Sequence, residues 1–139
     1  MLTRRFFAQC ALCAIGGFAA TEVNAQGAAP AAATNGVSRV IVQRSDGPAP
    51  GFETILVTAE IAAGAKVARH THPGIESSYL LTGGGELLVD GQAARTVKPG
   101  DTYLIATGAI HALNNGAAVS TVSTTYIVEK GKPLASPAA

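Results

Sequence analysis

The stretch that decides the fold is GAKVARHTHPGIE, which occupies residues 64–76. Its histidines, His70 and His72, are two positions apart, so on a β-strand their side chains point to the same face and can hold one object together. The Pro-Gly pair that follows ends the strand, because proline has no N–H and glycine tolerates unusual backbone angles. We expect the chain to reverse there and to bring Glu76 back beside the two imidazoles on a neighbouring strand.

A third histidine, His111, completes a candidate metal site. The 139-residue chain has only three histidines, and all of them lie between residues 64 and 115. Most isolated His-x-His pairs bind nothing, so a purely structural role is the alternative. Three neutral imidazoles and one carboxylate are a suitable ligand set for one divalent first-row transition metal. We therefore predict a four-ligand site with open positions for water or substrate: His70, His72, Glu76 and His111.

The spacing around these residues resembles the two sequence motifs of the cupin superfamily, in particular its small single-domain members. The first motif is matched by Gly64, His70, His72, Glu76 and Gly83, and the second by Gly100, Gly108, His111 and Asn115. The resemblance implies a small jelly-roll barrel with the four ligands inside it. Ala106 stands where the family usually has proline, which affects the rigidity of a turn rather than metal binding. We expect Gly83 and Gly108 to serve the backbone.

From residue 37 onward the chain consists of short β-rich runs separated by Gly, Pro, Asn and Asp, a pattern typical of a sandwich or barrel. Besides the histidine strand, the expected strands are residues 40–43, 53–61, 77–82, 86–89, 94–97, 102–106, 110–113 and 119–129. Asp90-Gly91 lies between two of these runs and predicts a hairpin. No stretch keeps a helical period over two turns. We predict an all-β, single-domain jelly-roll barrel.

Alternation along the Glu76 strand predicts the wall of the site. If Glu76 faces inward, three further side chains of its strand should do so: Ser78, Leu80 and Thr82. A metal site that decarboxylates or isomerises usually needs a separate acid or base within reach of the substrate. The remaining candidates are Glu53, Glu60 and Tyr103, and each is more simply a solvated strand residue or a packed aromatic. The sequence therefore argues against lyase or isomerase chemistry.

Residues 1–25 are predicted to be a signal peptide. Arg4-Arg5 precedes an apolar run at residues 8–20 that is too short to span a bilayer about 30 Å thick. Small residues at Val23–Ala25 suit cleavage before Gln26. The arginine pair followed by two phenylalanines resembles a twin-arginine signal, whose pathway exports folded proteins, and an ordinary secretory signal is the alternative. Both predict a periplasmic or secreted protein.

The rest of the chain divides into three parts. Residues 26–36 are rich in alanine without alternation and are expected to be a flexible lead-in. Residues 37–130 form the predicted cupin domain, and residues 131–139 a C-terminal tail. Cys10 and Cys13 both lie in the signal, so the mature chain is expected to have no disulfide.

Charge and hydropathy restrict the partners. Removing two arginines and one glutamate with the signal leaves eight basic and eight acidic residues of the original ten and nine. No basic run or aromatic-interleaved patch predicts nucleic-acid binding. No apolar run after the signal predicts a membrane span. A small-molecule ligand or substrate is the expected partner, and a homodimer is one candidate assembly.

Two functions follow from the predicted site. In the first, the protein is a mononuclear metal-dependent enzyme, dioxygenase-like, acting on a small oxygen-donor substrate. In the second, it is a non-catalytic module that binds a metal or small ligand. Zinc, nickel or copper would suit the donor set, since the Irving–Williams order favours copper and zinc over manganese and iron. Folded export would instead fix the metal in the cytoplasm, and we therefore favour iron or manganese.

Overall fold

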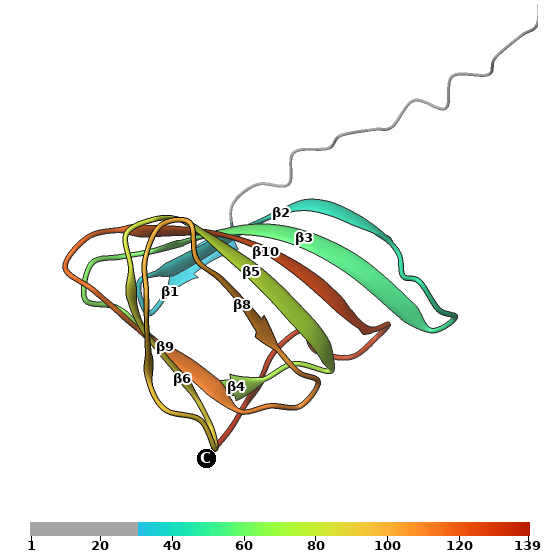
Figure 1. Cartoon of the computed structure of the whole chain (residues 1–139). Coiled ribbons are helices and arrows are strands. Elements are labelled where there is room, and N and C mark those ends of the chain that lie inside the picture. The colour runs from blue at the N-terminus through green and yellow to red at the C-terminus, as the bar shows by residue number, and fades with distance from the viewer. Residues whose placement is uncertain (1–30) are drawn as a thin grey trace, which may run out of the picture.

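The computed structural model describes residues 31–139, which form strands and turns without a helix. The predicted signal peptide and its cleavage site before Gln26 lie outside the described residues. Two antiparallel sheets face each other across the interior (Figure 1). In this part of the chain there is no helix of the length and apolarity that a membrane span requires. The all-β jelly-roll expectation is confirmed.

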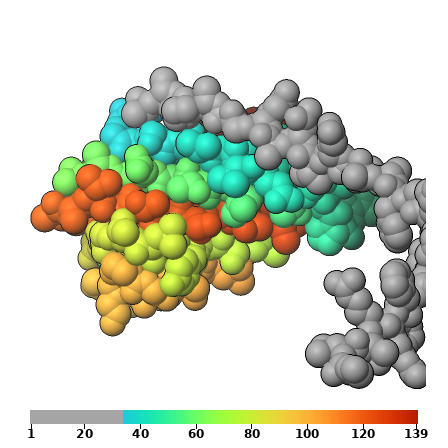
Figure 2. Space-filling view, turned by 90° about the horizontal axis from the view of Figure 1, so that it is seen from above, coloured from blue at the N-terminus to red at the C-terminus, as the bar shows by residue number. Residues whose placement is uncertain are grey.

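The two sheets differ in size and strand length. The six-stranded sheet has the order β1 (Ala31–Thr34), β2 (Val37–Asp46), β3 (Phe52–Ile61), β10 (Ser120–Glu129), β5 (Gly74–Thr82) and β8 (Thr102–Ile105). The five-stranded sheet has the order β11 (Ser136–Pro137), β4 (Lys66–Thr71), β9 (His111–Asn115), β6 (Gly85–Val89) and β7 (Arg95–Val97). Figure 2 shows the larger sheet from above, with bands for β2, β3, β10, β5 and β8 running side by side.

The core lies between the sheets, and the long strand β10 shows the alternation that builds it. Buried and partly buried residues alternate along the whole of β10. One cluster joins both sheets: Val37, Ile61, Leu80, Leu87, Val97, Ile105, Leu113 and Val122. Each such aliphatic side chain stabilises the fold by about 1.5–3 kcal/mol when it is removed from water. A second cluster lies on the larger sheet: Ile55, Val57, Tyr126 and Val128.

The inward set on β5 is shorter than alternation predicts. Ser78 and Leu80 are buried as expected, but Thr82 is exposed. The register with β10 slips at this point, so that Thr82 pairs with Thr121 while Leu80 pairs with Val122. This irregularity breaks the period-two pattern. The expectation that Thr82 faces inward is therefore wrong.

We expected the chain to reverse at the Pro-Gly pair and to bring Glu76 back on a neighbouring strand. The chain instead crosses from β4 in the smaller sheet to β5 in the larger one, where Gly74 pairs with Val128. A Cβ at Gly74 would overlap the carbonyl oxygen of Ile127. Glycine is thus required for this crossing by close backbone approach.

Both ends of the domain are more ordered than the sequence analysis expects. Within the expected flexible lead-in, residues 31–34 form β1, which pairs with β2. Asn35 and Gly36 join them with positive φ angles of 53° and 76°. Asn-Gly is the preferred pair for a tight hairpin turn. The predicted tail also folds back, since β11 pairs with β4.

The predicted Asp90-Gly91 hairpin is confirmed by the pairing of β6 with β7.

Asn115, the last residue of the second motif, holds the chain together at the end of β9. Its Nδ2 donates to the carbonyls of Ile61, Ala62 and Ala118 at 2.8–3.0 Å. Its Oδ1 accepts from Ser120 Oγ at 2.5 Å. Buried carbonyls without such a donor would be costly. The asparagine of this motif therefore has a structural role.

Candidate metal centre

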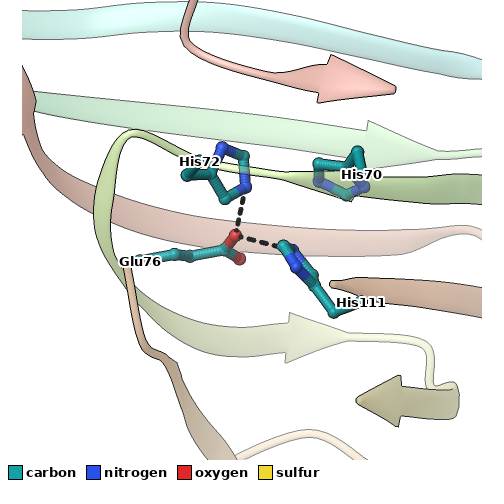
Figure 3. A group of neighbouring side chains, drawn as sticks. All are labelled: His70, His72, Glu76 and His111. Carbon is teal, nitrogen blue, oxygen red and sulfur yellow. Dashed lines mark hydrogen bonds and ion pairs between the residues drawn. The ribbon is translucent and has the colours of Figure 1, made fainter. Parts of the chain in front are cut away.

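The structure brings the four predicted ligands together. His70 lies on β4, His111 begins β9 in the same sheet, and Glu76 projects from β5 in the opposite sheet. His72 lies just beyond the end of β4. The candidate ligand atoms of all four residues lie within 4.8 Å of one another. Figure 3 shows the imidazoles and the carboxylate converging on one point. Three of the four residues are buried, with exposed fractions of 4% for His72, 5% for Glu76 and 5% for His111.

Strand pairing and side-chain contacts explain this convergence. His70 and His111 are direct partners in the β4–β9 ladder, and their ring centroids are 4.1 Å apart. Glu76 Oε2 lies 2.8 Å from His72 Nε2 and 3.2 Å from His111 Nε2. The turn before His111 forms without the family's proline, since Ala109 N donates to Ala106 O at 3.0 Å. The Ala106 departure therefore leaves the site intact.

Backbone carbonyls fix the orientation of all three imidazoles. The Nδ1 atoms lie at hydrogen-bond distance from three carbonyl oxygens: His70 at 2.8 Å from Ala68, His72 at 2.6 Å from Leu134 and His111 at 3.0 Å from Ala109. A carbonyl oxygen only accepts, so each Nδ1 must carry a hydrogen. Each ring, when it is neutral, then keeps its Nε2 lone pair free. Such outer hydrogen bonds typically orient metal-binding histidines.

The Nε2 of His72 shows that the donor set suits a cation. This buried nitrogen has no hydrogen-bond partner among residues 31–139. While the ring is neutral, the Glu76 Oε2 atom 2.8 Å away cannot be a partner, because neither atom then has a hydrogen to donate. An unpaired buried acceptor facing an anion is unfavourable. A divalent transition metal would satisfy the lone pairs and the carboxylate together, so the cluster could hold one such ion.

The electrostatics favour the metal-binding protonation state of Glu76 and of His70, whereas Glu76 shifts His111 toward its protonated form. Burial would raise the pKa of Glu76, but the close contacts with His111, His72 and Ser78 outweigh it and hold that pKa well below its usual range. Burial lowers the pKa of His70. Burial also lowers the pKa of His111, but the contact with Glu76 raises it overall. An ionised carboxylate and a neutral His70 are ready to bind a cation without first losing protons.

A hydroxyl relay orients the carboxylate from the other side. Ser78 Oγ donates to Glu76 Oε1 at 2.7 Å. Because this uses the only hydroxyl hydrogen of Ser78, the 2.8 Å contact with Thr124 Oγ1 must be a donation from Thr124. The relay leaves Oε2 facing the histidines. Sequence alternation places Ser78 inside, but only the β5–β10 register identifies Thr124 as its partner.

Two hollows that share part of their lining adjoin the cluster. The inner cavity has about 40 Å³ of space for the centres of water-sized molecules, and its lining includes Glu76, His111, Tyr103 and Tyr126. This is room for roughly three waters. The outer pocket has about 360 Å³ by the same measure, and its lining includes His70, His72 and Tyr126. A small ligand can therefore approach the cluster from outside.

The three candidate acid–base residues have different outcomes. Tyr103 lines the inner cavity, where burial and then the charge of Glu76 raise its pKa to about 12. Glu53 instead pairs with Arg44 at 2.9 Å, and Glu60 is exposed. The sequence analysis missed Tyr126, which stands opposite Glu76 in the β5–β10 ladder. Its pKa is also raised, chiefly by burial.

The C-terminal tail supports the site from a distance in sequence. Leu134 supplies the carbonyl that fixes His72, and β11 pairs along β4. Beyond it, Arg69 Nε donates to Ala139 O at 3.0 Å. The tail thus positions one imidazole.

We expect deletion of residues 133–139 to weaken metal binding by about 10- to 100-fold, the usual effect of losing an outer-shell partner. Competition with a chromophoric chelator measures this. Deletion of Ala138 and Ala139 alone is the control, because it keeps the Leu134 carbonyl. Equal affinity in the two truncated proteins would contradict a positioning role for the tail.

Comparisons with known proteins agree with this architecture. A family model described as a cupin domain matches residues 57–132. Among curated proteins, none matches the sequence. An RmlC-like cupin from Shewanella frigidimarina NCIMB 400 is 17% identical with a TM-score of 0.64, covering 76% of this chain and 87% of that one.

Two enzymes are among the other similar structures. The DMSP lyase DddQ from Ruegeria pomeroyi DSS-3 is 22% identical with a TM-score of 0.58, covering 67% of this chain and 44% of its own. The polyketide cyclase RemF from Streptomyces resistomycificus is 17% identical with a TM-score of 0.59, covering 70% of this chain and 68% of its own. At these identities the similarities show the fold alone.

Proposed function

Because the chain belongs to the cupin family, whose model covers residues 57–132, we propose that it is a mononuclear metal-dependent enzyme acting on a small oxygen-donor substrate. The single observation that carries the proposal is the convergence of three Nε2 atoms and the Glu76 carboxylate beside a cavity. The unpartnered Nε2 of His72 supports it further. Oxygen chemistry of the dioxygenase type is the reaction we favour.

The chain's own residues would divide the work as follows. A divalent metal held by the cluster would polarise an oxygen donor and offer open coordination positions. The Thr124–Ser78 relay would hold Glu76 in one orientation. Tyr103 and Tyr126 remain neutral phenols because both pKa values are raised. They can donate a hydrogen bond to a substrate oxygen, but they do not act as bases near neutral pH.

Metal identity and location are part of the proposal. We favour iron or manganese as the native ion and export to the periplasm or beyond, on the strength of the arginine pair at Arg4-Arg5. Affinity alone would select copper or zinc at a site of this kind. The metal content of protein isolated from its own compartment is the direct measure.

Proton-transfer chemistry is a second candidate. The solved structures with this fold include a DMSP lyase and a polyketide cyclase. The observation that favours this alternative is the presence of two phenols, Tyr103 and Tyr126, in the inner cavity. Both are acids rather than bases, and Glu76 is already used by the cluster. Dioxygenase-like chemistry needs no separate base, so we place it first.

Oxygen consumption tests the proposal. Protein loaded anaerobically with Fe²⁺ or Mn²⁺ is mixed with catechols, flavonols, thiols and β-diketones, and we expect uptake of O₂ with at least one class. His111→Ala is the inactive control. Product formation without O₂ uptake would favour the proton-transfer alternative. Metal binding without any turnover would leave a binding module and reject an enzymatic function.

A further inference from the structure

Arg39 is a cationic side chain on the inner face of the larger sheet. It lies on β2 opposite Ala59 of β3, which in turn stands opposite Val122 of β10. All three residues line the inner cavity. Because its neighbour in the ladder is alanine, the long arginine side chain has room on this face. Arg39 is only partly exposed.

Arg39 also lies where the two hollows meet. Five residues line both of them: Val37, Arg39, Val67, His70 and Tyr126. Arg39 therefore lines the same two hollows as His70, one of the four candidate ligands. A ligand that reaches His70 from either hollow is therefore in a space that Arg39 also lines.

No acidic partner neutralises this arginine within residues 31–139. Arg44 and Arg69, by comparison, pair with Glu53 and Asp90 at 2.9 Å and 2.7 Å. A guanidinium carries five N–H donors, and leaving them unpaired in a partly buried place is unfavourable. The free donors of Arg39 thus point to a ligand that residues 31–139 do not supply.

The charges that line the two hollows favour an anionic ligand. The outer pocket is lined by Arg39 and Lys66, and its lining contains no Asp or Glu. The inner cavity adds one acid, Glu76. With a divalent ion in the cluster, two positive charges on the metal and one each on Arg39 and Lys66 exceed the single negative charge of Glu76. An anionic group is therefore attracted to these two hollows.

We propose that Arg39 binds a carboxylate of the substrate. The substrate is then a small carboxylic acid whose second oxygen donor reaches the metal ion held by the four candidate ligands. The guanidinium matches a carboxylate with two parallel hydrogen bonds. The inner cavity admits only a small group, whereas the outer pocket is several times larger. This inference rests on the proposed function and names its substrate class.

Dicarboxylates of increasing length test the proposal, since one carboxylate can reach the metal and the other Arg39. Zinc-loaded protein, chosen because zinc has no redox chemistry, is titrated calorimetrically with malonate, succinate and glutarate and with the corresponding neutral diamides. We expect at least one diacid to bind more tightly than its diamide. We expect Arg39→Gln to weaken that binding by about 10- to 100-fold, as for a lost charge-assisted hydrogen bond.

Two further variants make the result specific. Arg39→Lys keeps the charge without the planar fork and should restore part of the affinity. Arg44→Gln removes a positive charge from the same strand outside the two hollows and should change the affinity less than about two-fold. Thermal unfolding and zinc content are measured for each variant. Unchanged diacid affinity in folded, zinc-loaded Arg39→Gln, or no preference for any diacid over its diamide, would overturn the proposal.

The outcomes separate this inference from the function on which it rests. Arg39-dependent diacid binding without any turnover would retain the carboxylate site and reject the enzyme. Turnover that is insensitive to Arg39→Gln would retain the enzyme and reject the carboxylate site. A wild-type protein that binds no divalent metal would overturn both.

Discussion

Replacing His111 with alanine should lower the affinity for a divalent metal by more than about 100-fold, since even outer-shell partners contribute 10- to 100-fold. The change removes one of three Nε2 donors and leaves a void beside Glu76. His111 is also the partner of His70 across β4 and β9, so its loss opens the centre of the cluster. Metal content after dialysis and competition with a chelator measure the effect. His70→Ala and His72→Ala should behave alike.

Asn114→Ala is the matched control on the same strand. Its side chain points away from the cluster and contacts Glu86 at 3.3 Å on the surface. It should bind metal as the wild type does. A folded His111→Ala protein with full metal occupancy would show that the second motif is structural here and that the proposed ligand set is wrong.

The histidine cluster could be anticipated because its signals are local. One residue separates His70 from His72 on an extended chain, and alternation alone puts them on one face. Glu76 was expected in the right place for the wrong reason, because the chain crosses between sheets rather than reversing within one. The direct pairing of His70 with His111 depends on a β4–β9 register that the sequence does not contain.

Residues that act through strand registers or long loops could not be anticipated. Leu134 reaches His72 from 62 positions away, through a tail that shows no strand pattern. Arg39 and Tyr126 come to the cavities only when β2, β3, β10 and β5 are aligned. The turn at Asn35-Gly36 could have been predicted, because Asn-Gly is a hairpin signal. The alanine-rich composition of residues 26–36 led us to expect a flexible segment there instead.

Substitution of Gly83 by alanine should destabilise the fold by about 3–5 kcal/mol, combining left-handed strain with overpacking. Gly83 has a φ of +78°, and a Cβ there would lie 2.6 Å from both Ser120 Cα and Val119 O. These are backbone atoms of a central strand and of the residue before it, so they cannot move away cheaply. The adjacent Gly84 N–H donates to Ser120 Oγ at 2.8 Å, which fixes the approach. Urea denaturation measures the loss.

Gly108 separates the effect of left-handed strain from the effect of overpacking, although both glycines are motif positions in the sequence. Its φ of +72° is similar, but no heavy atom lies within 4 Å of a Cβ built there. Gly108→Ala should therefore cost only the left-handed strain, about 1–2 kcal/mol. Its N–H, which donates to His72 O at 3.1 Å, is retained, so metal affinity should not change. Equal losses of stability at the two positions would contradict the close packing of Gly83 on Ser120, and intact stability with lost turnover would place these glycines at the substrate entrance.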